Sequence, residues 1–435
     1  MDRKTAVSYT AAELSARGKQ DIPSELVSGT HLIYNSPASL MFNSPGAEGY
    51  GVKRAGLSVP DSVMLLVAPG CCGRNTSLIS AMPEYHNRFF YLMMDETDLV
   101  TGRHLTKIPE AIEEICSFLP KKPSAVMICI TCVDALLGTD MERVCRKAEK
   151  AAGVRVRPCY MYALTREGRK PPMVHVRQSI FSMLETRTRD PRAVNLLGYF
   201  AGLRPDSELY PLLHGAGIRC IREIGKCDSF EDYLAMAEAN FNLILHPEAR
   251  FAAEDLLQRL GIPSVELTRL YQIERIRRQY AAFGAAIGVS LEDSAYYEAA
   301  ETEIERFRTK YGPVSFAIGE FLNANPFELA ASLLQYGFRV SEIYAAPEPE
   351  HYVYVNRIAS LSPETRIYSN LEPTMLYYAI GEGSADLTIG KDASYYHPDT
   401  PNVPWNSDIQ PFGYSGVVSL FRELDQAMSR QEVRQ

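Results

Sequence analysis

Short apolar runs alternate with amphipathic stretches along most of this chain. Residues 63–67, 89–94 and 125–131 have the bulky, β-branched composition of buried strands. Residues 108–118 and 141–152 carry apolar side chains at the spacing of a helix. Because strands that alternate with helices form parallel sheets covered on both faces, the pattern predicts an α/β fold.

The alternation recurs along the rest of the chain, which at 435 residues is too long for one compact core. We therefore predict three doubly wound, Rossmann-like parallel-sheet modules around a central crevice, which is the expected ligand site. Their expected ranges are 1–190, 191–310 and 311–435. The middle range includes a polar helical connector over residues 273–308, and residues 11–18 are expected to form a short helix.

Composition narrows the class of protein. Apolar residues make up 46% and charged residues 23% of the chain, as in ordinary globular proteins. The net charge of −8 and the lack of a basic face argue against nucleic-acid binding. No apolar run has the length of a membrane span, and the first residues lack a signal-peptide pattern, so we expect a cytoplasmic protein.

Three cysteines stand just beyond predicted strands. Cys71 and Cys72 follow the strand at 63–67 after a Pro-Gly turn, and Cys132 follows the strand at 125–131. If both strands belong to one parallel sheet, Cys72 and Cys132 emerge at the same edge, where ligands bind in such folds. Converging thiolates suit a soft metal centre. The alternative is that each cysteine is a small buried apolar residue.

The other six cysteines fit the sheet and helix interiors or lack a position at a strand end. The odd total of nine favours free thiols and a metal site over disulfides in a cytoplasmic chain. The six are Cys116, Cys129, Cys145, Cys159, Cys220 and Cys227.

A few polar residues are further candidates. Asp95 could provide an oxygen ligand to a metal centre. His246 follows a predicted strand at a switch point, so it is either structural or a proton donor to a substrate. Glu248 lies near a predicted helix start, where a carboxylate is stabilised anyway. His397 is expected on a loop, and the 25 tyrosines either pack or line a cavity for a flat substrate.

Four short motifs, in order, resemble a known family. Residues 68–73 (Ala-Pro-Gly-Cys-Cys-Gly) are similar to a Gly-Pro-x-Gly-Cys-Gly segment, and residues 95–102 to an acidic run after the next strand. Thr131-Cys132, with residues 137–140, resembles a cysteine before a Gly-Asp-Asp helix start. Residues 411–416 resemble a Tyr-Ser-Gly helix entry. Together they resemble nitrogenase component 1 and its relatives, including protochlorophyllide reductase catalytic subunits and the nickel-tetrapyrrole reductive cyclase.

The resemblance implies a bridging iron–sulfur cluster. It aligns Cys72 and Cys132 with cluster ligands, while Cys71 is either a third ligand or packs beside the cluster. Four thiolates complete a [4Fe–4S] cube, so two chains with two cysteines each would hold one cluster, as a homodimer or as a heterodimer with a related chain. Neither a Walker A segment nor a Gly-x-Gly-x-x-Gly follows a strand. The resemblance implies that electrons come from an ATP-dependent iron–sulfur reductase.

The departures from the family pattern carry functional information. No cysteine occurs at residues 43–56, upstream of the first motif. Where nitrogenase has the two ligands of its large metal cofactor, this chain has Pro247 and Gln410. Neither side chain coordinates as a thiolate or imidazole does, so no iron–molybdenum-type cofactor is expected. An organic substrate is expected in that pocket, with Tyr199, His246 and the turn at 411–414 around it.

Three functions remain open at this point. The first is a nitrogenase-like oxidoreductase that reduces a small organic substrate, such as one of the tetrapyrrole type, with His246 as its catalytic residue. The second is a non-catalytic partner subunit or a cofactor-assembly scaffold. The third is a periplasmic-type binding module for a metal chelate, against which the strand-end cysteines and the missing signal peptide count.

Overall fold

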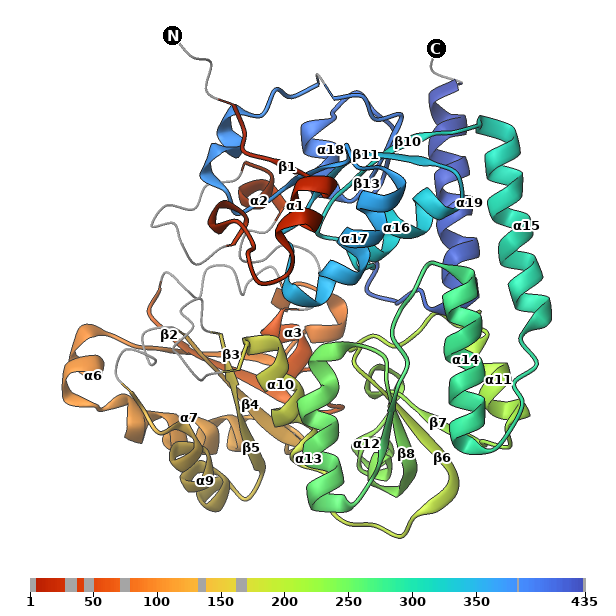
Figure 1. Cartoon of the computed structure of the whole chain (residues 1–435). Coiled ribbons are helices and arrows are strands. Elements are labelled where there is room, and N and C mark those ends of the chain that lie inside the picture. Colours follow the sequence, from red (N-terminus) through yellow and green to blue (C-terminus); the bar gives the residue numbers. More distant parts are fainter. Residues whose placement is uncertain are drawn as a thin grey trace. The chain divides into compact units, whose positions relative to one another are not determined.

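Three sheets built mainly of parallel strands form the framework of the protein, so the predicted α/β class is confirmed (Figure 1). The computed structural model describes residues 5–27, 37–42, 51–70, 79–131, 138–161, 170–381 and 383–432. Cys71, Cys72 and Cys132 lie outside these described residues. Within the described part, no helix has both the length and the apolar character needed to cross a bilayer.

The first sheet contains four parallel strands, each joined to its neighbour in the same direction. In spatial order they are β3 (Phe89–Met93), β2 (Val63–Ala68), β4 (Ala125–Ile130) and β5 (Arg155–Tyr160). All six residues of β2 are buried because both faces of the sheet are covered. Val63, Leu65 and Val67 pack toward the core that includes α7 and α9, whereas Met64 and Leu66 face the core that includes α3 and α10. The helices of this module are α3 (Val52–Gly56), α6 (Glu96–Thr101), α7 (His104–Phe118), α9 (Met141–Ala152) and α10 (Pro172–Phe181).

The second sheet also has four parallel strands. Their spatial order is β7 (Cys220–Arg222), β6 (Asp190–Leu197), β8 (Ala239–Ile244) and β9 (Ser264–Glu266). One apolar cluster joins residues of β2 and β4 to Leu197, Ile244 and the inner face of α13, so the first two sheets share a core. The helices here are α12 (Phe230–Leu234) and α13 (Arg250–Leu260), with 3₁₀ turns η4 (Ala235–Glu238) and η5 (Pro247–Ala249).

The third sheet has six strands, of which only the first is antiparallel to its neighbour. Their spatial order is β1 (Tyr9–Thr10), β12 (Arg366–Tyr368), β11 (Arg339–Tyr344), β10 (Ser315–Ile318), β13 (Leu387–Ile389) and β14 (Asn402–Val403). Its helices are α1 (Ala11–Arg17), α2 (Pro37–Phe42), α16 (Pro326–Gln335), α17 (Tyr352–Leu361), α18 (Lys391–Tyr396) and α19 (Gly413–Glu432).

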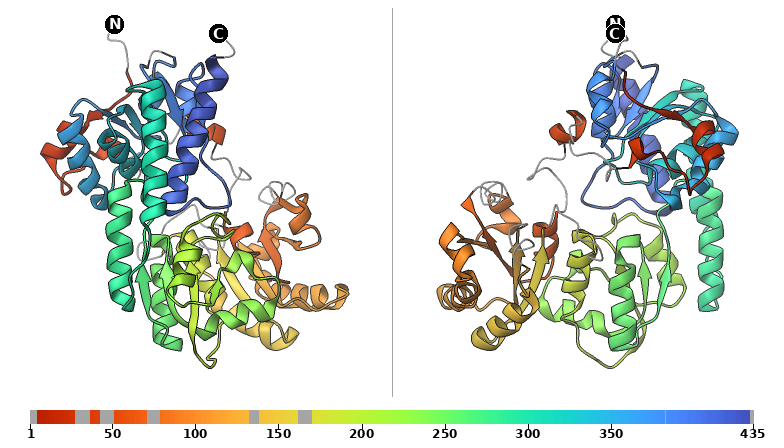
Figure 2. Two further views of the ribbon diagram at one scale, coloured as in Figure 1. Left: turned by 90° about the vertical axis from the view of Figure 1, so that its right-hand side faces the viewer. Right: turned by 60° about the vertical axis from the view of Figure 1, so that its left-hand side comes forward.

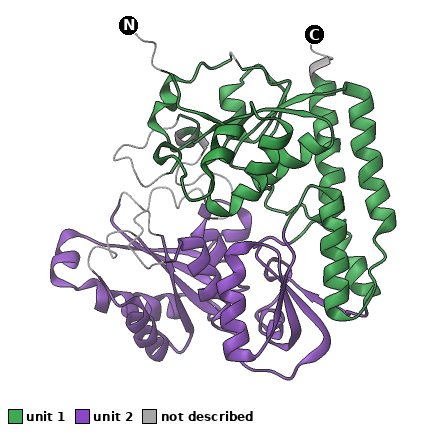
Figure 3. Ribbon diagram, viewed as in Figure 1, with its two compact units in different colours: residues 1–47, 203–216, 269–435 green, residues 48–202, 217–268 purple. Residues whose placement is uncertain are grey.

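The chain divides into two compact units (Figure 3). One unit contains residues 48–202 and 217–268, with the first two sheets. The other contains residues 1–47, 203–216 and 269–435, with the third sheet and helix α11 (Leu209–Gly215). The expected ranges 191–310 and 311–435 each begin close to a new sheet. The expected range 1–190 differs at its start, because β1 pairs with β12 and places the N-terminal segment with the third sheet.

The connector predicted over residues 273–308 is helical and consists of two helices. Helix α14 (Ile273–Ile287) ends at Gly288, whose φ of 76° is left-handed and terminates the helix. Helix α15 (Ser294–Tyr311) then runs alongside α19 (Figure 1, and Figure 2, left). Arg306 and Lys310 of α15 both pair with Asp425 of α19, at 3.1 and 2.7 Å, and help to hold the two helices together.

Candidate functional site

Two strands of the first sheet end side by side at its switch point. Val67 of β2 is paired with Ile130 of β4, and from β2 the chain crosses to β3 on one side before returning to β4 on the other. Ligands of doubly wound sheets bind at such a point, beyond the carboxyl ends of the strands. The segments that contain Cys71, Cys72 and Cys132 begin at these two strand ends, although those cysteines themselves are outside the described residues.

Hydrogen bonds fix both strand ends. The carbonyl of Ala68 accepts bonds from the Tyr91 hydroxyl (2.9 Å) and the Met94 N–H (3.0 Å), and the carbonyl of Ile130 accepts one from the Met161 N–H (3.1 Å). Thr131 is buried, and its hydroxyl oxygen has no hydrogen-bond partner among the described residues. A buried polar group of this kind costs free energy unless something satisfies it. The hydrogen bonds at Ala68 and Ile130 thus fix the backbone from which the segments that carry the cysteines continue.

The six remaining cysteines are free thiols, three of them fully buried. Burial raises the pKa values of the Cys145 and Cys159 thiols well above their usual range, and that of Cys227 to about 11. A thiol must lose its proton to bind a metal, so these three are poor ligands. The buried positions of Cys145 and Cys159 agree with the prediction that these two residues lie in the interior.

The acidic run that begins at Asp95 has a structural explanation. The Asp95 carboxylate accepts a hydrogen bond from the Asp98 N–H at 2.7 Å, and the Asp98 carboxylate accepts one from the Asp95 N–H at 3.2 Å. Together the two bonds cap helix α6. Hydrogen bonds from Lys107 and Arg103 hold the pKa of the buried Asp98 carboxyl well below its usual range. This arrangement gives Asp95 a capping role, while its role as an oxygen ligand stays a prediction.

His246 stands at the switch point of the second sheet. It lies two residues beyond β8, next to the end of β6, as the sequence predicted. Its Nδ1 accepts the Glu248 N–H at 3.3 Å, so the neutral ring carries its proton on Nε2. The ring lies edge-on to Tyr199 at 5.8 Å, and the Tyr199 hydroxyl donates to the Leu245 carbonyl. With 38% of its side chain exposed, His246 can reach a ligand.

Arg177 holds the segments around His246 together, and it was not predicted from the sequence. It projects from α10, and its guanidinium donates to the Gly198 carbonyl at 3.0 and 2.7 Å and to the Glu248 carboxylate at 2.7 Å. It also lies over the Phe200 ring at 4.5 Å. The sequence signal that could have found Arg177 is its position as a single cationic residue within the mainly apolar stretch of α10. The Arg177–Glu248 pair, with the Glu248 N–H bond to His246, fixes the imidazole in place.

Gly198 lets β6 approach His246 closely, which gives a test of the local geometry. Its φ is 135°, and a Cβ added there would lie 2.7 Å from the His246 backbone nitrogen. Gly198→Ala should therefore lower the free energy of unfolding by roughly 2–4 kcal/mol through strain and overpacking. Urea unfolding would measure the change. Gly215→Ala is the control because nothing lies within 4 Å of its added Cβ, and equal stability of both variants would contradict the geometry.

The Tyr-Ser-Gly entry of α19 is anchored by a buried carboxylate. Glu208 accepts the N–H groups of Tyr414 (2.7 Å) and Ser415 (3.0 Å) and the Tyr280 hydroxyl (2.7 Å). The side chain of Gln410 is also engaged, by Arg269 and by the Ser407 and Asp408 carbonyls. These side chains thus have structural partners within their own unit.

His397 follows the end of α18 in a loop, as predicted, and its side chain is buried. Its Nε2 lies 2.8 Å from Glu342 Oε2 and 2.8 Å from the Tyr344 hydroxyl, and Tyr378 also donates to Glu342 at 3.0 Å. The side chain is only 1% exposed. This polar cluster lies inside a group of stacked tyrosines, including Tyr396. The geometry supports the structural role for His397.

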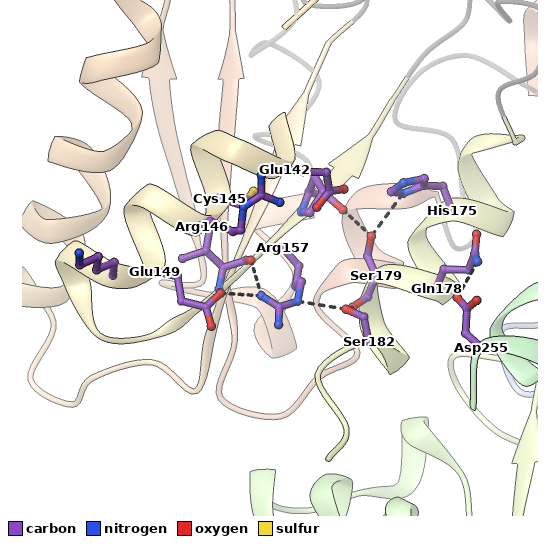
Figure 4. A pocket seen from close by; sticks show the side chains of 13 residues that line it. Glu142, Cys145, Arg146, Glu149, Arg157, His175, Gln178, Ser179, Ser182 and Asp255 are labelled. Carbon is purple, nitrogen blue, oxygen red and sulfur yellow. Dashed lines mark hydrogen bonds and ion pairs between the residues drawn. The ribbon is translucent and has the colours of Figure 1, made fainter. Parts of the chain in front are cut away.

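A polar hollow of about 630 Å³ lies against α9, β5 and α10 (Figure 4). In its centre Arg157 bonds to Glu149 at 2.6 Å and to the Ser182 hydroxyl at 3.0 Å. Acidic and basic side chains line it in equal number, so its charge selects neither an anion nor a cation. They are Glu142, Glu149, Asp255, Arg146, Lys150 and Arg157.

Comparison with known proteins decides the family. The profile of the nitrogenase component 1 type oxidoreductases matches residues 48–429. The chain belongs to this family. The resemblance seen in the four motifs is thereby confirmed, and the match covers both units of the protein.

Individual relatives of this nitrogenase component 1 type chain include proteins of cofactor biosynthesis. It is 24% identical over 413 residues to the nitrogenase iron-molybdenum cofactor biosynthesis protein NifE of Sinorhizobium fredii, with 88% of this chain and 82% of that one covered. It is 25% identical over 197 residues to the nitrogenase molybdenum-iron protein alpha chain of Methanosarcina barkeri, covering 44% and 36%.

The fold is that of solved nitrogenase structures. A structure described as nitrogenase Cp1 at pH 6.5 superposes with a TM-score of 0.69, covering 95% of this chain and 97% of that chain. The sequence identity in this comparison is 17%, so the likeness concerns the fold.

Proposed function

We propose that this chain is the electron-accepting subunit of a nitrogenase-like complex, which holds a [4Fe–4S] cluster between two subunits and reduces an unsaturated organic substrate of the tetrapyrrole type. The observation that carries the proposal is the pair of adjacent strand ends, β2 and β4, each followed within a few residues by cysteine. Cys72 and Cys132 would be the ligands, and two chains would supply the four thiolates that a cube needs. Cys71 would pack beside the cluster or replace a ligand.

The family context supports this reading. The matching family is described as nitrogenase component 1 type oxidoreductases, and the NifE relatives are named for the biosynthesis of a metal cofactor. When bound, the cluster would supply one-electron transfer. The protein's own contribution is the strand edge formed by Ala68, Ile130 and Thr131, which would orient the thiolates toward one another. A homodimer and a heterodimer with a related chain both complete the ligand set.

The substrate would be organic rather than a large metal cofactor. Pro247 has no donor side chain, and the Gln410 amide is occupied by Arg269 and two carbonyls. Neither residue therefore fits the ligand role of the family's iron–molybdenum-type cofactor. His246 would act on the substrate as hydrogen-bond donor through Nε2, held by Tyr199, Glu248 and the chain around Gly198. To donate a proton the ring would first take up a second proton on Nδ1, which lies 3.7 Å from the Glu248 carboxylate.

Electron supply gives a direct test. Since the sequence has no phosphate-binding loop, reduction should require a nitrogenase-reductase-like iron–sulfur protein with MgATP. A water-soluble porphyrin is a suitable probe, with reduction followed by its absorbance. Dithionite alone should give little turnover, and omission of ATP should remove it. Efficient turnover with NADH and no partner protein would contradict the proposal.

A cofactor-assembly scaffold is the second candidate, because the NifE relatives cover most of this chain. A reductase and a scaffold differ in whether the metal cluster stays bound to the protein. A reductase returns to its starting state and turns over repeatedly with its cluster retained. A scaffold passes a metal cluster to an acceptor protein and loses iron in proportion. Iron analysis of the chain after incubation with partner, ATP and acceptor separates them.

A further inference from the structure

The third sheet has its own switch point, at which two carboxyl groups meet. Ile318 of β10 is paired with Ile389 of β13, and the chain leaves β10 toward β11 on the opposite side. The edge beyond these strands is the ligand position of a doubly wound sheet. Glu320 follows β10, and Asp392 follows β13 in the first turn of α18.

The Asp392 carboxyl group contacts the backbone of Glu320. It is fully buried, and its Oδ2 accepts the Glu320 N–H and the Asn370 side-chain amide, both at 2.7 Å. Its Oδ1 has no hydrogen-bond partner among the described residues. A Cβ added to Gly319 would lie 2.0 Å from that oxygen, so the strand end can approach the carboxyl group only as glycine. Glu320 itself is half-buried and therefore accessible to a ligand.

The surroundings of Glu320 and Asp392 favour the protonated form of these carboxyl groups. Burial and the neighbouring charge of Asp392 raise the pKa of Glu320 to about 7, and Glu348 acts in the same direction. The Asn370 amide and the Ala346 N–H oppose them. Burial raises the pKa of Asp392 as well. Carboxyl groups whose pKa lies near the working pH are effective general acids.

A metal ion is a poorer occupant for this edge. Among the described residues, no third histidine, cysteine or carboxylate gathers with Glu320 and Asp392 closely enough to share an ion. Glu348, Glu350 and His351 do gather, but His351 Nδ1 accepts the Glu348 N–H at 3.1 Å, so its Nε2 carries the proton of the neutral ring. A ligating histidine instead donates its second N–H and binds through the other nitrogen.

We propose that Glu320 is a proton-donating residue for an unsaturated organic ligand bound at the carboxyl ends of β10 and β13, with Asp392 as its positioning residue. The role rests on the proposed reductive function. In reduction of a C=C bond, the substrate takes two electrons from the iron–sulfur reductase and two protons. The Glu320 O–H bond breaks as one new C–H bond forms, water supplies the second proton, and the Glu320 carboxylate regains its proton from solvent.

Infrared spectroscopy of the complete protein across neutral pH tests the acid directly. The wild type should show a protonated-carboxyl band with a midpoint at about 7. Burial also raises the pKa of Glu328 to about 7, so the Glu320 contribution is the part of the titrating band that is lost in Glu320→Gln. Glu350→Gln, at an exposed acid nearby, should leave the whole band unchanged. Asp392→Asn removes the like charge and should move the midpoint to lower pH. A wild type without a titrating band, or an E320Q protein whose titrating band has the same amplitude as that of the wild type, would overturn the proposal.

Turnover of a water-soluble porphyrin with the reductase and MgATP tests the donor role. E320Q should lower kcat roughly 100-fold with its iron content unchanged, whereas E350Q should match the wild type. D392N should move the alkaline limb of the rate profile to lower pH. If the wild type reduces the porphyrin and E320Q has the same kcat, the donor role is overturned while the proposed function stands. A wild type that reduces no porphyrin overturns the proposed function, and with it the donor role, even if the carboxyl band is present.

Discussion

Replacing Cys72 or Cys132 by serine should remove the iron–sulfur cluster from the protein. Each replacement takes away two of four thiolates in a symmetric dimer, since the loss occurs in both chains. Two remaining cysteines cannot hold a cube, and a serine hydroxyl is a much poorer ligand for iron. The measurement is the iron and acid-labile sulfide content of anaerobically purified protein, with the visible absorbance of the cluster as a second readout.

Cys145→Ser is the matched control. Cys145 is 3% exposed in the core formed with α7 and β4, and burial keeps its thiol protonated. Its replacement should leave the iron content unchanged. In a heterodimer each of the two variants would remove only one ligand, and partial iron loss would point to that assembly. Full iron retention in both the Cys72 and the Cys132 variant would contradict the assigned ligands.

Replacing His246 by alanine should lower turnover roughly 100-fold or more while the iron content and the cluster spectrum stay unchanged. The imidazole lies just beyond β8 in the second sheet, whereas the proposed cluster ligands follow β2 and β4 in the first. Its Nε2–H is the group that would donate to the substrate, because Nδ1 is engaged by the Glu248 N–H. Porphyrin reduction with the reductase and MgATP measures the loss.

A second histidine provides the comparison for this result. His214 is exposed on α11, away from any strand end, so His214→Ala should retain full activity. His246→Gln, which keeps a polar side chain, should retain the stability of the wild type and still lose activity. If His246→Ala turned over at the wild-type rate, His246 would have only its structural role at the start of η5.

The framework followed from the sequence because its signals are local. β2 and β4 are uninterrupted apolar runs, and burial on both faces of the sheet explains why they do not alternate with polar residues. The position of His246 followed in the same way, from the end of the run in β8. Residues 273–308 are helical as predicted, but the division into two helices at Gly288 was not recognised.

Contacts between distant segments could not be predicted from local pattern. The pairing of β1 with β12 joins residues more than three hundred positions apart and consists of two residues per strand. Arg177 reaches Glu248 from another module, and its role depends on that approach. The same holds for Glu320 and Asp392, which are unremarkable as single acids until the sheet brings them together. His397 was expected on a loop, and only the fold shows its burial against Glu342.

The central claim is that two copies of this edge, or one copy with a related chain, hold a single iron–sulfur cluster. The direct measurement is the iron and sulfide stoichiometry of anaerobically purified wild-type protein, with its mass in solution determined on the same sample. We expect a brown dimer with about four irons and about four sulfides per two chains. A colourless protein without iron, purified both alone and with any neighbouring homologue, would contradict it.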